Sequence, residues 1–250
     1  MICFFSATGN CKYVAERIAG ALDDTAVSII DGETDITLAE GEAFGLVTPT
    51  YFWELPVPVR AFLSKVILRG GGSHYTFLVA TYGTTTGCCG EDARRILARR
   101  KIVLDGSFSV KMPDTWTPIF DLSDPQKVAR QNQAAEAAIT SVIPRIQAGE
   151  RGNHTGRRLP YAVRIITDPM MNAQRKTRHF HVEDGCIGCG LCAGKCSEKA
   201  IAIRDKKPVW VKDRCALCLG CLHRCPVFAI QYGSGRTRRH GQYHNPNTKI

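Results

Sequence analysis

Cysteine placement is the sequence feature that most constrains how this chain can fold. Eight of its twelve cysteines lie in the 40 residues from 186 to 225, and the other four all precede residue 90. A disulfide framework is expected in short secreted chains, but most of this 250-residue chain is cysteine-poor, and its N-terminus lacks the pattern of an export signal. Close, regular spacing instead indicates metal ligation in a reducing compartment, which we expect to be the cytoplasm.

The eight clustered cysteines form two copies of the pattern C-x2-C-x2-C-x3-C, which start 29 residues apart. This spacing is typical of bacterial iron–sulfur ligation. A pair of zinc sites or a disulfide knot is the alternative, but zinc sites use two separated cysteine pairs and need no third cysteine at the same spacing. Each run is followed three residues later by Ala-Ile, so each copy is predicted to be a cysteine loop, a short helix and a short strand.

Residues 181–232 therefore resemble the two-cluster bacterial ferredoxins, a small α+β fold. The resemblance implies one-electron transfer through two [4Fe–4S] clusters, with the last cysteine of each run bound to the cluster of the other run. It assigns one cluster to Cys186, Cys189, Cys192 and Cys225, and the second to Cys215, Cys218, Cys221 and Cys196. Gly188, Gly190 and Gly220 suit loops whose backbone N–H groups point at sulfur. Ser197 replaces the proline of the family pattern, a change that affects a turn and no ligand.

Short apolar runs alternate with helical patterns over the first 150 residues. Five strands are predicted at residues 2–5, 26–30, 43–47, 75–80 and 108–112, and four helices at 13–22, 57–68, 92–100 and 125–146. Apolar strands that alternate with helices are typical of a parallel sheet covered on both faces. The sequence therefore predicts an α/β doubly wound domain.

The first predicted strand leads through a hydroxyl- and glycine-rich loop directly into a helix. This loop, Ser6-Ala7-Thr8-Gly9-Asn10-Cys11, offers backbone N–H groups, two hydroxyls and the positive end of a helix dipole, which together suit a phosphate. It is neither a Walker A loop nor a Gly-x-Gly-x-x-Gly loop. An ordinary capped turn is the alternative.

The Ser-x-Thr-Gly-Asn sequence resembles the FMN phosphate loop of flavodoxins. That resemblance implies a five-stranded parallel sheet of order 2-1-3-4-5, with flavin beyond the carboxyl ends of the strands. Two more loops match by position, one after the third strand and one after the fourth. The predicted FMN contacts are Ser6, Thr8, Gly9, Asn10, Cys11, Pro49, Thr50, Tyr51, Phe52, Trp53, Thr81, Tyr82 and Gly83. Cys11 replaces the usual Thr or Ser, which removes one hydroxyl donor.

The whole chain is similar to the fused flavodoxin–ferredoxin proteins of anaerobic prokaryotes, including its Met112-Pro113-Asp114 segment. The predicted parts are a flavodoxin-like domain at 1–148, a linker at 149–180 with one irregular helix around 168–177, the ferredoxin domain at 181–232, and a basic tail at 233–250. The resemblance implies an electron-transfer protein. Two other hypotheses are a ferredoxin-fed, FMN-dependent reductase of a small organic substrate and a redox-sensing module.

Charge also divides the chain. Residues 1–150 hold 14 Lys and Arg against 17 Asp and Glu, whereas residues 151–250 hold 19 against 6. We therefore expect a redox partner with an acidic docking surface, steered by Arg236, Arg238 and Arg239. Neither a nucleic-acid platform nor an apolar run near the ~20 residues of a membrane span is present. No hydrolytic triad or carboxylate pair can be picked out. Cys88-Cys89 are interpreted as ordinary packing residues or exposed thiols, with a redox-active vicinal dithiol as the alternative, and His223 as solvated or packed beside a cluster.

Overall fold

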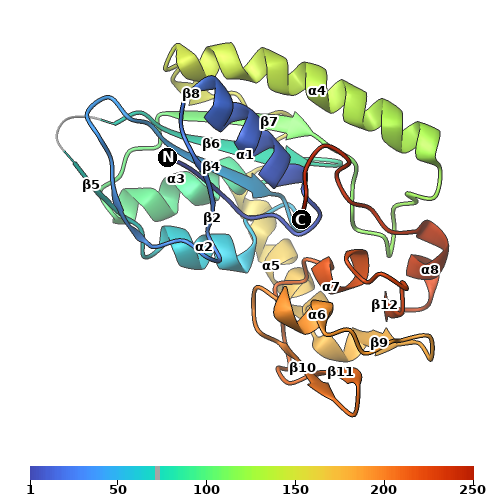
Figure 1. Cartoon of the computed structure of the whole chain (residues 1–250). Helices are drawn as coiled ribbons and strands as arrows, with labels where there is room; N and C mark the ends of the chain where they lie inside the picture. The colour runs from blue at the N-terminus through green and yellow to red at the C-terminus, as the bar shows by residue number, and fades with distance from the viewer. Residues whose placement is uncertain (71–73) are drawn as a thin grey trace.

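The computed structural model describes residues 1–70 and 74–250. Its centre is a six-stranded parallel sheet in the order β2-β1-β4-β6-β7-β8 (Figure 1). The strands are β1 (Ile2–Phe4), β2 (Ala26–Ser28), β4 (Phe44–Pro49), β6 (Thr76–Tyr82), β7 (Gly106–Lys111) and β8 (Gly152–Asn153). The predicted order 2-1-3-4-5 is confirmed for the first five strands of this sheet, which has a flavodoxin-like fold. The sixth strand was not predicted, because its two residues are too few to carry a period.

Alternate side chains along each strand pack on opposite faces of the sheet, so both faces are apolar. Ile2 and Phe4 contact the core beneath α1 (Asn10–Ala21) and α4 (Pro125–Gln147). Cys3 and Phe5 contact the core beneath α2 (Val57–Leu63) and α3 (Cys89–Arg99). Burial of each large apolar side chain contributes roughly 1.5–3 kcal/mol, which is why the strands read as continuous apolar runs.

One predicted helix is shorter than its apolar pattern. The helix predicted at 57–68 ends at Leu63, and the chain then forms β5 (Ile67–Arg69), which pairs in parallel with β3 (Asp35–Thr37). The apolar pattern predicted too long a helix, because Val66 packs in the same core after the helix has ended. An Arg69–Asp35 ion pair of 2.6 Å joins the two short strands.

The cysteine-rich part lies below the carboxyl edge of the sheet in Figure 1. Its two antiparallel pairs are β9 (Phe180–Val182) with β12 (Ile230–Tyr232), and β10 (Ile201–Arg204) with β11 (Lys207–Trp210). Each cysteine run enters a four-residue helix, α6 (Leu191–Gly194) or α7 (Gly220–His223), as the repeat predicts. Phe180 stacks on Trp210 with ring centroids 4.9 Å apart and packs edge-on against Tyr232, so aromatic contacts join the two strand pairs.

The predicted linker and tail are more structured than the sequence indicates. The linker holds β8, the 3-10 turns η1 (Tyr161–Val163) and η2 (Thr177–His179), and α5 (Arg164–Gln174), which begins four residues before the predicted 168. Buried partners on the sheet domain anchor α5, since Arg164 pairs with Asp92 and Thr167 donates to Glu54. The tail contains α8 (Arg236–His240). None of the helices described is both long and apolar enough to cross a bilayer.

Candidate functional site

The loop between β1 and α1 presents backbone N–H groups at the start of a twelve-residue helix. Gly9 adopts a left-handed φ of 94° at the N-cap, and its N–H donates to Ser6 Oγ at 3.1 Å, which closes the loop. Within the described part of the chain, the N–H groups of Thr8, Asn10 and Cys11 meet no acceptor. Unpaired N–H groups at a helix N-terminus suit a phosphate, so the loop fits the group that its sequence predicts.

Two predicted contacts in this loop have side chains engaged elsewhere. Asn10 Oδ1 lies 2.9 Å from the hydroxyl of Tyr243 and accepts a hydrogen bond of 3.1 Å from Asn245 Nδ2. The Cys11 thiol lies 3.1 Å from Thr81 Oγ1 inside the domain, and burial raises its pKa to about 12. Both residues can therefore offer backbone N–H groups to an anion, whereas their side chains hold the loop in place.

All three predicted loops converge on a cavity of about 250 Å³ at the carboxyl edge of the sheet. The predicted contacts that line it are Ser6, Thr8, Asn10, Cys11, Pro49, Thr50, Tyr51, Phe52, Trp53, Thr81, Tyr82 and Gly83. Gly9 is the exception, because its α-carbon faces the C-terminal tail: a side chain there would lie 3.0 Å from Asn245 and 3.1 Å from Ile250.

Sequence reasoning missed a fourth wall of the cavity, which follows β7. Met112, Asp114, Trp116, Ile119 and Phe120 all line it. The Met112-Pro113-Asp114 segment carried the family resemblance, and its position after a strand could have placed it at the same edge. A Cβ at Gly83 would lie 2.2 Å from Asp114 Oδ2, so glycine is needed there for close approach. Burial raises the pKa of the Asp114 carboxyl above its ordinary value.

The aromatic loop after β4 is held in a strained backbone conformation. Phe52 and Trp53 have φ values of 47° and 63°, a region that non-glycine residues rarely adopt. The Trp53 carbonyl accepts a 2.7 Å hydrogen bond from the Cys88 N–H, and the neighbouring Gly87 leaves room for that carbonyl. The ring centroids of Phe52 and Trp116 lie 5.4 Å apart. The loop is thus positioned from behind by α3 and its preceding turn.

Cys88 and Cys89 lie in this supporting turn as buried thiols. Cys88 is 2% exposed and Cys89 is fully buried. Burial raises the pKa of Cys88 to about 11 and that of Cys89 further, so both thiols are protonated at neutral pH. A reactive dithiol needs accessible thiolate, and packing is the interpretation that these surroundings support.

Four of the predicted cluster cysteines line one hollow in the ferredoxin part. They are Cys186, Cys189 and Cys192 of the first run and Cys225 of the second, the set that the resemblance assigns to one cluster. Cys189 is exposed. No group of three or more His, Cys, Asp or Glu side chains in residues 1–70 and 74–250 is placed to hold a metal ion. The four cysteine thiolates that bind a [4Fe–4S] cluster lie farther apart than the ligands of a single metal ion, because the cluster core stands between them.

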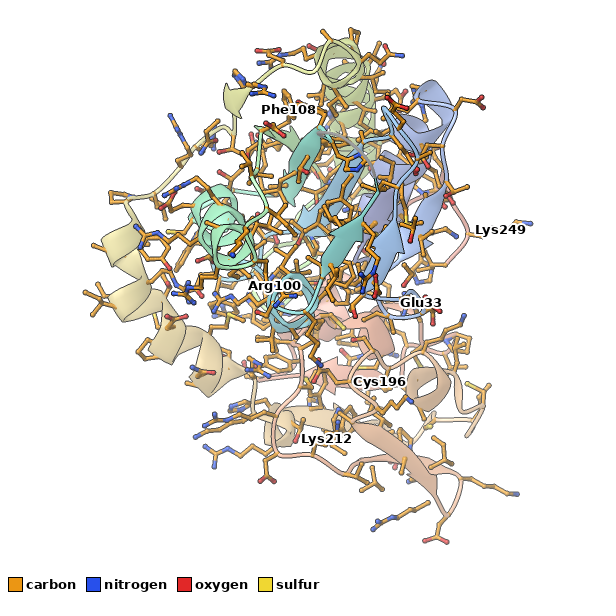
Figure 2. All side chains as sticks on the ribbon, turned by 90° about the vertical axis from the view of Figure 1, so that its left-hand side faces the viewer. Glu33, Arg100, Phe108, Cys196, Lys212 and Lys249 are labelled. Atoms are coloured by element: carbon orange, nitrogen blue, oxygen red, sulfur yellow. The ribbon has the colours of Figure 1, made fainter. Side chains whose placement is uncertain are left out.

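The second predicted set is nearer to the cavity. Burial raises the pKa of Cys218 and of Cys221, and the neighbouring Cys196 thiol adds to both shifts. Cys196 of the first run therefore lies near the second-run thiols, and Cys192 of the first run, which is assigned to the other cluster, also lies near Cys221. Figure 2 shows Cys196 nearer to the sheet domain than Lys212.

The second cysteine run also forms part of the cavity wall. Cys218 lines the cavity together with Leu217 and Leu219. The position that a Cβ on Gly220 would take is 3.5 Å from Cys218 Sγ and 3.7 Å from the Ala7 Cβ, so this thiol lies beside the phosphate loop. Across the same boundary, Arg224 donates a 3.2 Å hydrogen bond to the carbonyl of Ser6.

His223 is a packing residue and is not solvated. It is fully buried, with Nε2 2.9 Å from the carbonyl of Thr115 and Nδ1 3.2 Å from the N–H of Tyr243. Burial lowers its pKa to about 4, so it is neutral, donates through Nε2 and accepts through Nδ1. His223 thereby joins α7 to the loop after β7 and to the tail.

Comparison with known proteins gives one domain-family match and one curated relative. Residues 1–88 match the flavodoxin domain family. An uncharacterised polyferredoxin-like protein of Methanocaldococcus jannaschii is 36% identical over 62 aligned residues, and the match covers 20% of this chain and 37% of that relative. The two matches support a fused flavodoxin–ferredoxin-type protein.

Two solved structures also match part of the chain. A flavodoxin from the domain Archaea matches with a TM-score of 0.38 and 14% identity, over 59% of this chain and 96% of its own. Rubredoxin oxygen:oxidoreductase from the anaerobe Desulfovibrio gigas matches with a TM-score of 0.32 and 8% identity, over 58% of this chain and 36% of its own.

Proposed function

We propose that this protein transfers electrons between two [4Fe–4S] clusters and one FMN, and that it works in the reducing cytoplasm. The observation that carries the proposal is the shared wall: Cys218 of the second cysteine run lines the same cavity as the three flavodoxin-type loops. When bound, FMN exchanges electrons one or two at a time and each cluster exchanges one, so together they convert between the two kinds of transfer.

The residues around the cavity are suited to hold a flavin phosphate and ring. The N–H groups of Thr8, Asn10 and Cys11 are available for the phosphate, with the Thr8 hydroxyl in the cavity wall. Tyr51, Phe52, Trp53 and Tyr82 supply aromatic surface for the ring. Leu217 and Leu219 place apolar side chains in the cavity wall on either side of Cys218 in the sequence.

The two cysteine sets differ in their surroundings, and this suggests an order of transfer. The set of Cys196, Cys215, Cys218 and Cys221 would serve the flavin, since Cys218 lies at the cavity. The set of Cys186, Cys189, Cys192 and Cys225 would meet the outside partner, since Cys189 is exposed. We propose a partner with an acidic surface, although Arg238 already pairs with Glu183 at 3.1 Å, which leaves Arg236 and Arg239 as its main contacts.

A second candidate function is a ferredoxin-fed, FMN-dependent reductase of a small organic substrate. One observation favours it: the cavity extends past the flavodoxin-type loops to Ile119 and Met170, which are 62% and 44% exposed. An open apolar mouth of this kind is able to admit an apolar acceptor.

The test of the proposed function is the cofactor content of the full chain after anaerobic purification. We expect about eight irons, eight acid-labile sulfides and one FMN per chain. Zinc in place of iron, a single surviving cluster after full reconstitution, or a chain that takes up no flavin would contradict the proposal. Turnover of a small acceptor at the FMN, without any protein acceptor, would favour the reductase.

A further inference from the structure

The last ten residues of the chain return from the ferredoxin part to the phosphate loop. The Asn245 N–H donates to the carbonyl of Thr8 at 2.8 Å, and Lys12 Nζ donates to the carbonyl of Lys249 at 2.5 Å. The Thr248 hydroxyl donates to Glu16 at 2.7 Å. Figure 1 shows the C-terminus beside the start of α1, and Figure 2 shows Lys249 beside the sheet domain, far from Lys212. The tail is therefore bonded to the loop and to the first turns of α1.

Two tail side chains reach a buried network centred on Asn10. Tyr243 is 5% exposed, Asn245 is 3% exposed and Asn10 is 7% exposed. Both tail residues contact Asn10 Oδ1, while Asn10 Nδ2 donates to the carbonyl of Pro113 at 3.4 Å. Asn10 is the first residue of α1, so the tail helps to fix the point where the loop turns into the helix.

Gly9 lies tightly against the tail. A Cβ at Gly9 would lie 3.0 to 3.1 Å from side-chain atoms of Asn245, Thr248 and Ile250. The tail thus fills the space that a side chain would take on the outer side of the loop. The neighbouring loop residues Thr8, Asn10 and Cys11 line the cavity.

The other end of the tail is bonded to the helix that carries a cluster cysteine. Gln242 Nε2 donates to the carbonyls of Leu222 and Cys225 at 2.7 and 2.8 Å, and the Tyr243 N–H donates to His223 Nδ1. One short segment therefore contacts both α7 of the ferredoxin part and the phosphate loop of the flavodoxin part.

We infer that residues 243–250 are a positioning element of the flavin phosphate site. They hold Thr8, Gly9 and Asn10 so that the loop N–H groups face a phosphate monoester. Because the same segment is bonded to α7, phosphate binding favours docking of the ferredoxin part, and docking favours phosphate binding. This inference rests on the proposed function. It assigns the tail a role in binding that neither its composition nor its charge indicates.

The test compares two flavins that differ only in the phosphate. Full-length protein is stripped of flavin and titrated with FMN and with riboflavin, with flavin fluorescence as the readout. Asn245→Ala should weaken FMN binding by about tenfold, the effect of losing a hydrogen bond that supports a charged ligand, and leave riboflavin binding unchanged. Asn247→Ala is the matched control, because Asn247 is an exposed asparagine of the same tail.

A second variant keeps the test informative if Asn245→Ala does not fold. Thr248→Val keeps the shape of the side chain but removes the hydrogen bond to Glu16, and it should also weaken FMN binding selectively. Equal FMN affinities for Asn245→Ala, Thr248→Val and Asn247→Ala would overturn the inference alone. A parent protein that binds no flavin, or binds riboflavin as tightly as FMN, would overturn the proposed phosphate site and this inference with it.

Discussion

At the scale of single residues, the sequence predicts the role of some residues, whereas the role of others depends on the contacts that they make in the folded chain. The cysteine spacing identifies eight ligand candidates, but a residue such as Asn10 has a role that depends on its partners. Its side chain lies within hydrogen-bonding distance of Tyr243, Asn245 and Pro113, all more than 100 positions away. The family resemblance implies that Asn10 contacts the phosphate. Because its side chain is bonded to the tail and to Pro113, its backbone N–H is the group available for that contact.

Replacing Cys225 tests the exchange of ligands between the two runs. Cys225→Ser should remove about half of the eight irons, from the cluster of Cys186, Cys189 and Cys192, although Cys225 belongs to the second run. Iron analysis and low-temperature EPR of the reduced protein measure the loss. The buried non-ligand Cys88 provides the control, since Cys88→Ser should keep all eight irons. Loss of the other cluster instead would show that each run binds its own fourth cysteine.

Replacing Arg224 tests the electrostatics between the two cofactor sites. A [4Fe–4S] cluster with four thiolates carries a formal charge of about −2, and reduction adds another negative charge. Arg224 lies beside Cys218 and Ser6, so its cation favours the reduced form. Arg224→Gln should therefore lower the reduction potential of that cluster in a redox titration. The exposed Arg239→Gln variant should leave it unchanged, and equal potentials for both variants would contradict this account.

At the scale of elements, short connections decide where the functional loops lie. The turn before α3 supports the aromatic loop through one hydrogen bond, from the Cys88 N–H to the Trp53 carbonyl at 2.7 Å. Glycine at position 87 makes that approach possible, because a Cβ there would lie only 1.9 Å from the same carbonyl.

Two glycines allow this steric requirement to be measured. Gly87 and Gly149 both have left-handed φ values, 54° and 64°, but a Cβ at Gly149 would meet no atom within 4 Å. Gly149→Ala should cost only the backbone strain of about 1–2 kcal/mol. Gly87→Ala should cost clearly more and should also weaken FMN binding, because it displaces the aromatic loop. Thermal unfolding of the holoprotein and flavin titration measure both effects, and equal losses in the two variants would contradict this role of Gly87.

At the scale of the whole molecule, the chain crosses between its two parts twice. The first crossing is α5, anchored by Arg164 on Asp92 and by Thr167 on Glu54. The second is the tail, which runs from α7 to α1. Both crossings connect the ferredoxin part to the sheet domain, and Cys218 of the second cysteine run lines the cavity. The basic residues of α8 are exposed, on the opposite side of the molecule from β2.

Salt dependence tests whether those exposed charges steer a partner. Flavin reduction by a low-potential donor protein should slow as salt rises, because exposed charges are screened beyond roughly 8 Å at physiological ionic strength. Neutralising Arg236 and Arg239 to Gln should slow the reaction at low salt and have little effect at high salt. Stopped-flow absorbance of the flavin measures the rate. A rate that is unaffected by salt and by these substitutions would contradict electrostatic docking.

The sequence by itself determined those features that depend on neighbours along the chain. The alternation of strands and helices, the glycine turn into α1 and the spacing of the cysteine runs are all read from patterns a few residues long, whereas the strand order followed from the family resemblance. The same local signals failed at Ile67, where core contact continues past a helix end, and at β8, whose two residues carry no period.

Only the tertiary structure decided which distant segments meet. The tail has no apolar period, yet it packs on Gly9 and bonds to Asn10, because its partners are buried polar groups that no local pattern records. The wall formed by Asp114 and Cys218 likewise joins residues 104 positions apart. The physical reason is that hydrogen bonds and packing act across space, whereas hydrophobic periodicity reports only which face of one element is buried.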